Sequence, residues 1–300
     1  MADRAIRTVL EGMSYLEGPR WHDGRVYVSD FYTGDVVAVD LEGAGDRETI
    51  TNVPAQPSGL GWMPDGSMLV VSMRDRRVLR VRAGGAAEVH ADLSALAPWH
   101  LNDMVVDSRG RAYVGNFGFD LMSGAPMRAA GIIRVDPDGS ATVVAEDLMF
   151  PNGTVILPDA RTLIVAETLG GRLTAFDVAD DGSLSNRRVW AKLSETPDTE
   201  DLGELIAAGG VAPDGAALDA EGAIWAADAI GGRVLRVREG GEVVDEIAPG
   251  TGVFACALGG ADGRTLLMCA APSFAEHERR DTREAVLLAC EVDVPRAGLP

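Results

Sequence analysis

A chain of 300 residues with 46% hydrophobic residues can bury a sizeable core, and we expect residues 1–300 to form one domain. Its net charge of −19 would repel phosphate backbones and anionic lipid, so nucleic-acid and membrane partners are not expected. No apolar run approaches the roughly 18 residues of a membrane helix, and the charged N-terminal residues lack the apolar core of a signal peptide. These features predict a cytoplasmic protein.

One sequence plan recurs six times along the chain, with copies that start at residues 18, 59, 103, 153, 215 and 255. Each copy has a short apolar run, a turn rich in Asp, Gly or Pro, and a second β-prone run (VYVSD, MLVVS, AYVGN, TLIVA, AIWAA and TLLMC). A third run such as VVAVD or VLRV follows, and the connection has room for a fourth strand. Such repeats predict an all-β fold, a six-bladed β-propeller with four-stranded blades around a central channel.

Three segments fall outside the repeats. Residues 6–10 are β-prone, and we expect them to add a strand to the last blade and so close the circle of blades. Residues 119–131 are long for a hairpin connection, which is consistent with a lid over the channel or with a plain surface excursion. Residues 195–208 are predicted to be a surface insertion with a helical turn.

Oxygen-bearing side chains occupy equivalent positions just before the repeats. We call the six residues there the ring positions: Glu17, Ser58, Asn102, Asn152, Asp214 and Phe254. Because the first strand of each propeller blade lines the channel, these residues are expected to encircle its axis. Two carboxylates confined there would repel each other unless a cation lay between them. Carboxylate and amide oxygens suit Ca²⁺, Mg²⁺ or Mn²⁺ better than Zn²⁺, and Ca²⁺ is the first choice.

Other readings of these residues stay open at this point. Asn and Asp before Gly are common in turns, so Asn152-Gly153 and Asp214-Gly215 could be plain turns. Their match in repeat register favours the channel instead. The three cysteines, Cys256, Cys269 and Cys290, show no CxxC spacing and are expected to be buried, reduced thiols.

The chain resembles the senescence marker protein/gluconolactonase family, which includes regucalcin. The resemblance covers nearly the whole chain and is carried by short pieces in order: Leu16-Glu17-Gly18-Pro19 with Trp21, Pro57-Ser58-Gly59-Leu60, Leu101-Asn102-Asp103, Phe150-Pro151-Asn152-Gly153 and Ala212-Pro213-Asp214-Gly215. It implies one divalent metal ion bound by Glu17, Asn152 and Asp214, with Asn102 near the metal and the substrate. It also implies that Asp214 is the general base or nucleophile.

One departure from the family concerns the substrate. Animal-type sugar lactonases have an Arg two residues before the Asn of the Asn-Asp piece, and this chain has His100 there. With Trp99, Phe117 and Phe119 nearby in the sequence, a more apolar wall is expected. We therefore name His100, Trp99, Phe117, Ser58 and Asn102 as candidate substrate-binding residues, and the substrate as a small molecule.

The function implied is hydrolysis of a lactone or related ester. The metal would polarise the carbonyl, Asp214 would take a proton from the attacking water, and Asn102 and His100 would assist, His100 as a proton shuttle. Because a bound cation weakens a carboxylate as a base, the alternative gives water activation to the metal, with Asp214 steering the water. A phosphotriesterase, a non-hydrolytic pathway enzyme and a non-catalytic calcium-binding propeller are the other functions that the same scaffold accommodates.

Overall fold

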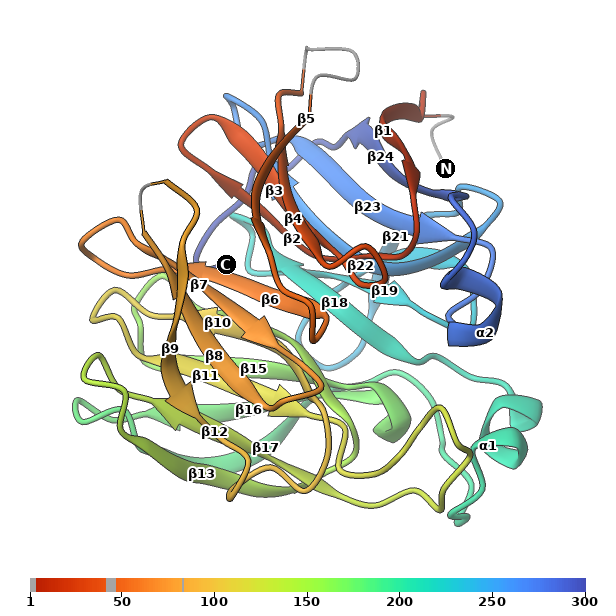
Figure 1. Cartoon of the computed structure of the whole chain (residues 1–300). Coiled ribbons are helices and arrows are strands. Elements are labelled where there is room, and N and C mark those ends of the chain that lie inside the picture. The colour runs from red at the N-terminus through yellow and green to blue at the C-terminus, as the bar shows by residue number, and fades with distance from the viewer. Residues whose placement is uncertain (1–3, 42–46, 83) are drawn as a thin grey trace.

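Six four-stranded antiparallel sheets surround a central axis in the computed structural model, which describes residues 4–41, 47–82 and 84–300 (Figure 1). The innermost strands of neighbouring sheets contact each other all the way round. They are β2 (Leu16–His22), β6 (Pro57–Trp62), β10 (Leu101–Val106), β14 (Pro151–Ile156), β18 (Pro213–Leu218) and β22 (Gly252–Gly259), and β22 contacts β2 again. The predicted six-bladed β-propeller is confirmed.

In the first five blades, four strands that are consecutive in the chain pair in order. The first blade continues outward with β3 (Arg25–Asp30), β4 (Asp35–Val39) and β5 (Arg47–Asn52), and the second with β7 (Met68–Ser72), β8 (Arg77–Val81) and β9 (Ala87–Asp92). The third has β11 (Ala112–Asn116), β12 (Ala130–Val135) and β13 (Ala141–Leu148), the fourth β15 (Thr162–Glu167), β16 (Arg172–Val178) and β17 (Leu184–Lys192), and the fifth β19 (Ile224–Asp228), β20 (Arg233–Val237) and β21 (Val243–Ile247). Strands such as β7, β11 and β19 are buried throughout, because both of their faces pack against neighbouring blades.

The last blade joins the two ends of the chain. It consists of β22, β23 (Thr265–Ala271), β24 (Ala285–Glu291) and the N-terminal strand β1 (Arg7–Met13), which pairs antiparallel with β24. The closing strand predicted at residues 6–10 is therefore present and extends to Met13. Beyond β24 the chain crosses the far end of the channel, where Leu299 bridges to Ile156 and Arg296 bridges to Asp219.

Helices are short and lie in the connections: the 3₁₀ turn η1 (Thr168–Gly170), α1 (Leu202–Ala208) and α2 (Glu276–Arg279). Helix α1 supplies the helical turn expected in the insertion. It begins after Asp201, whose side chain accepts a hydrogen bond from the backbone N–H of Glu204 at 2.9 Å. Within the described ranges, no helix is long and apolar enough to cross a membrane.

Every inner strand has a register shift at its ring position, as expected for a β-bulge. In four blades the next residue is glycine, and the spacing between inner strands explains it. A Cβ on Gly215 would lie 2.6 Å from Cα of Ala255 in the next blade, and one on Gly18 would lie 2.7 Å from the carbonyl oxygen of Ser58. The Asn-Gly and Asp-Gly pairs are therefore parts of strands β14 and β18, and the turn interpretation is wrong.

Candidate functional site

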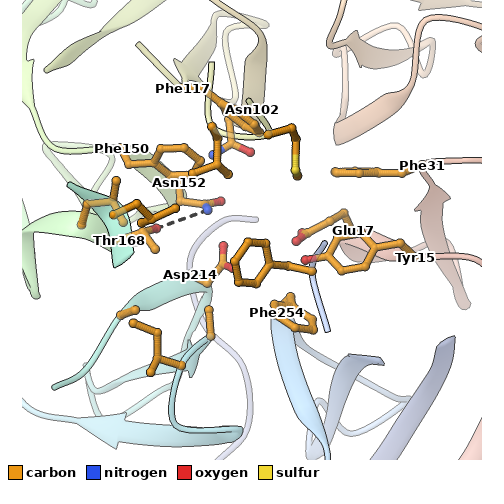
Figure 2. A pocket seen from close by; sticks show the side chains of 18 of the residues that line it. Tyr15, Glu17, Phe31, Asn102, Phe117, Phe150, Asn152, Thr168, Asp214 and Phe254 are labelled. Carbon is orange, nitrogen blue, oxygen red and sulfur yellow. Dashed lines mark hydrogen bonds between the residues drawn. The ribbon is translucent and has the colours of Figure 1, made fainter. Parts of the chain in front are cut away.

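A cavity opens at the end of the channel where the inner strands begin, with an empty volume of about 720 Å³ that includes part of its open mouth. Four of the six ring positions contribute polar side chains to its lining: Glu17, Asn102, Asn152 and Asp214. Figure 2 shows these side chains converging on the cavity from different blades. Residues distant in the sequence thus meet in one place, as the repeat register predicted.

The two amide side chains are oriented by the hydrogen bonds of their nitrogens. Nδ2 of Asn152 donates to Oγ1 of Thr168 at 3.3 Å, and Nδ2 of Asn102 donates to the carbonyl oxygen of Pro151 at 3.2 Å. Because each nitrogen has a protein acceptor, each amide oxygen remains available to a ligand in the cavity.

The two carboxylates are buried together. Burial and then the negative charge of Asp103 raise the pKa of Glu17 to about 8, against an ordinary value of 4.5. Burial and then the charge of Glu17 raise the pKa of Asp214 well above its ordinary value. Oδ1 of Asp214 is buried and has no hydrogen-bond partner in the described part of the chain. A bound cation would relieve both the repulsion and the unpaired oxygen.

The donor set fits a hard divalent cation. It offers carboxylate and amide oxygens, and no Cys or His lies among the described residues that line the cavity. Ca²⁺ takes about 6–8 oxygen ligands, so protein oxygens from four side chains leave room for water or a substrate oxygen. Two of the four donors are amides, so the site has only two acidic ligands. This agrees with the finding that no group of three or more His, Cys, Asp or Glu side chains suited to a metal occurs in the described ranges.

A neighbouring guanidinium is engaged elsewhere. Arg20 donates to Oδ1 of Asp103 at 2.6 Å, to the carbonyl oxygen of Met104 at 2.8 Å and to that of Leu60 at 3.0 Å. It lines a second cavity, at the opposite end of the inner strands. Among the described residues that line the first cavity, none carries a positive charge.

Three buried acids hold the chain just before the inner strands. We call Asp30, Glu167 and Asp228 the strand-end acids, because they end the second strands of the first, fourth and fifth blades. Each is 0% exposed and accepts hydrogen bonds from backbone N–H groups: Asp30 from Tyr15 at 3.0 Å, Glu167 from Met149 at 2.8 Å and Asp228 from Ala212 at 3.0 Å. Burial acts to raise the pKa of Glu167, but hydrogen bonds from Arg172, Thr174 and Met149 hold it below its ordinary value.

The strand-end acids occur in the blades that carry Glu17, Asn152 and Asp214. The other three second strands end in Ser72, Asn116 and Ala271. The sequence predictions missed these acids, although VYVSD, TLIVAE and AIWAAD show an acid at the same place in three repeats. Their hydrogen bonds fix the backbone next to each predicted ligand.

The cavity wall is mostly aromatic and aliphatic. Phe117 lines it as predicted, and Tyr15, Phe31, Phe150 and Phe254 join it. The ring centroids of Tyr15 lie 5.2 Å from Phe31 and 5.1 Å from Phe254, and those of Phe117 and Phe150 lie 4.5 Å apart. In Figure 2 the hydroxyl end of Tyr15 points into the cavity on the side of Glu17. The predictions did not include Tyr15.

Ser58, Trp99 and His100 do not line this cavity in the described part of the chain. Ser58 is buried in β6, where its carbonyl oxygen accepts a hydrogen bond from Ser29 at 2.6 Å. His100 stacks on Trp99, with ring centroids 5.1 Å apart, and contacts Phe117 at 5.9 Å. Burial and then the charge of Arg74 lower the pKa of His100 to about 4.

The cysteines are as predicted. Cys256, Cys269 and Cys290 are free and buried, and burial raises the pKa of each thiol above its ordinary value. None of them lines the cavity. They are core residues and not nucleophiles.

Comparison with known proteins agrees with the fold and with the family resemblance. Residues 16–272 match the family described as SMP-30/Gluconolactonase/LRE-like region. The chain belongs to this family. A 6-deoxy-6-sulfogluconolactonase of Pseudomonas putida is 28% identical over 280 residues, covering 90% of this chain and 89% of that protein. A pentonolactonase of Haloferax volcanii is 29% identical over 293 residues, covering 95% and 92%. The crystal structure of a calcium-binding protein, regucalcin, from Agrobacterium tumefaciens superposes with a TM-score of 0.77 at 23% identity, covering 99% of this chain and 97% of that one.

Proposed function

We propose that this chain is a metal-dependent hydrolase of a lactone or related cyclic ester. The observation that carries the proposal is the meeting of four oxygen-bearing side chains, two of them carboxylates, in one otherwise apolar cavity. Relatives in the same family that are named lactonases support the choice of reaction.

The site would hold one divalent cation through Glu17, Asn152 and Asp214, with Asn102 as a fourth oxygen donor. Ca²⁺ is the best match, and Mg²⁺, Mn²⁺ and Zn²⁺ are the alternatives. When bound, the cation would supply Lewis-acid polarisation of the substrate carbonyl and neutralise the two carboxylates.

Asp214 is the proposed general base. Its carboxylate would accept a proton from the attacking water. The oxygen of that water bonds to the carbonyl carbon, the ring C–O bond breaks, and the ring oxygen leaves as a hydroxyl after receiving a proton. Burial and the charge of Glu17 raise the pKa of Asp214 in the metal-free protein, and a bound cation would lower it again; the alternative therefore stands in which the water is activated at the cation and Asp214 steers it.

Other residues would position the substrate. The amide oxygen of Asn102 is free to face the cavity, and Phe117 forms the wall beside it. We call Glu17, Asn102, Asn152 and Asp214 the oxygen cluster. The apolar wall around these side chains would strengthen their polar interactions with a substrate, because it lowers the local dielectric constant. Contact of Ser58, Trp99 and His100 with substrate stays a prediction from the sequence.

The deciding experiment is turnover by the wild type and by Asp214→Asn, with Ca²⁺ in the buffer, on aldonolactones, aliphatic lactones, aryl esters and an aryl phosphotriester. Hydrolysis of a lactone by the wild type and a loss of about 10²-fold or more in the variant would support the proposal. Asp177→Asn is the matched control, because Asp177 is an exposed surface carboxylate outside the cavity. Equal turnover by Asp214→Asn would remove Asp214 from the mechanism, and preference for the phosphotriester would replace the lactone.

A further inference from the structure

The lining of the cavity outside its oxygen-bearing side chains is apolar. It consists of aromatic and aliphatic side chains, among them Phe31, Phe117, Phe150, Leu202, Ile206 and Phe254. The polar side chains of the described lining are the four oxygen donors, Thr168 and the hydroxyls of two tyrosines. The oxygen of Thr168 is already an acceptor for Asn152.

Two connections that are far apart in the sequence build the mouth. The loop between β11 and β12 supplies Leu121 and Met122, and α1 supplies Leu202 and Ile206. The spacing of Leu202 and Ile206, four residues apart in the helix, puts both on the same face of α1. The predicted surface insertion therefore borders the cavity.

The two connections are joined directly to each other. The backbone N–H of Met127 donates to the carbonyl oxygen of Glu200 at 2.8 Å, and the side chains of Arg128 and Glu200 form an ion pair. Met127 is 3% exposed, whereas Glu200 is exposed. These contacts join the two connections that border the cavity.

This wall does not match a sugar lactone. Each hydroxyl of an aldonolactone needs a hydrogen-bond partner once it leaves water, and an unmatched buried hydroxyl weakens binding. The relatives named sulfogluconolactonase and pentonolactonase concern such polar substrates. Outside the oxygen cluster, the described lining of this chain offers few groups that could pair with them.

We propose that the substrate is a lactone whose ring carries an apolar substituent, an alkyl or arylalkyl chain. The inference rests on the proposed function and deepens it. The lactone carbonyl lies at the oxygen cluster of Glu17, Asn102, Asn152 and Asp214. The substituent lies along the aromatic wall and ends against Leu202 and Ile206.

The first experiment measures kcat/KM, with Ca²⁺ present, for γ-valerolactone, γ-heptalactone, γ-nonalactone and γ-decalactone, and for D-glucono-δ-lactone. We expect an increase of roughly fourfold for each methylene group that the wall covers, and a lower kcat/KM for the aldonolactone. A higher kcat/KM for the aldonolactone, or equal values across the aliphatic series, would overturn the inference and leave the proposed hydrolase intact.

The second experiment places a polar group on the mouth. Ile206→Asn is expected to lower kcat/KM about tenfold more for γ-decalactone than for γ-valerolactone, because the short substituent does not reach α1. Ala207→Asn is the matched control, since Ala207 is an exposed residue of the same helix outside the cavity lining. An equal effect of Ile206→Asn on both lactones would contradict the proposed position of the substituent.

A binding measurement separates failure of the inference from failure of the proposed function. Should no lactone be hydrolysed, the rise in Tm of the wild type with γ-decalactone and with D-glucono-δ-lactone decides the ligand class. Stabilisation by γ-decalactone alone would refute the hydrolase and support the apolar ligand. Stabilisation by the aldonolactone alone, or by neither compound, would overturn the inference.

Discussion

Glu17 and Asp214 face each other across one cavity from the first and fifth blades, and no cationic side chain lies among the described residues of its lining. Two buried like charges in one cavity destabilise the fold unless a proton or a cation neutralises them. Cation and proton binding at this pair of carboxylates can therefore be measured through the stability of the protein, without knowledge of the substrate.

Removal of divalent cations with EDTA should lower the Tm, and Ca²⁺ should restore it. A ligand at 100-fold excess over its Kd stabilises the folded state by about 2.7 kcal/mol, which scanning calorimetry detects easily. The double variant Glu17→Gln/Asp214→Asn is expected to lose the response to Ca²⁺ and to be more stable than the metal-free wild type, since its repulsion is gone. An unchanged wild-type Tm on chelation would contradict a metal site.

Metal-free protein should become less stable as the pH rises from about 5 to about 8. In the folded state Glu17 keeps its proton up to a pKa of about 8, whereas in the unfolded chain it loses the proton near 4.5. The folded state then binds more protons than the unfolded state across this window, so the free energy of unfolding falls with pH. Added Ca²⁺ should release protons into a weakly buffered solution at about pH 6. A metal-free Tm that rises across the window would refute the raised pKa.

Asp228→Ala should destabilise the protein by about 1–3 kcal/mol in urea unfolding, because it leaves the buried backbone N–H of Ala212 without its acceptor and removes one of the two carboxylates that bond Arg233. Asp228→Asn, which keeps the shape, should cost less. Asp177→Ala, at an exposed carboxylate, should leave the unfolding midpoint nearly unchanged. Equal midpoints for Asp228→Ala and Asp177→Ala would show that the strand-end acid does not hold the inner strand.

Tyr15→Phe should reduce kcat about tenfold with little change in Tm. Burial, and then the charges of Glu17 and Asp214, raise the pKa of the Tyr15 phenol well above its ordinary value, so it stays protonated and can donate a hydrogen bond at the oxygen cluster. Tyr27→Phe is the control, since Tyr27 lies outside the cavity. Wild-type kcat in Tyr15→Phe would limit Tyr15 to a role in packing.

His100→Gln tests the predicted proton shuttle. A shuttle predicts a loss of about 10²-fold in kcat with a changed pH profile. His100 is instead placed against Phe117, and its pKa of about 4 keeps it neutral near pH 7. If His100→Gln and His100→Phe both change KM and leave kcat unchanged, His100 is not a proton shuttle. It then only supports Phe117 in the cavity wall.

The blades could be predicted because each repeat encodes its own strands and turns. The four oxygen donors could be predicted because a ring position has the same surroundings in every blade, which repeat register alone reveals. His100 shows that repeat register does not determine every side chain. It directly precedes its inner strand, as Tyr15 and Phe150 do, and both of those line the cavity. His100 does not line it and packs against Phe117 instead.

The mouth could not be predicted for a different reason. Leu121, Met122, Leu202 and Ile206 come from connections without a strand period, and these two connections meet through the contact between Met127 and Glu200. Such a contact joins two loops through tertiary structure, and neither loop encodes it alone. The sequence did indicate an apolar wall through Phe117 and Phe119, but it did not indicate which loops complete it.

The bulge at each ring position has a consequence for how such a protein can change. The strand pairing shifts register there whether the position carries the carboxylate of Glu17, the amide of Asn152 or the phenyl ring of Phe254. Six positions with the same strand irregularity therefore surround one axis and already carry chemically different side chains. A change of activity can begin with exchanges at these six positions, while the strands of the blades stay as they are.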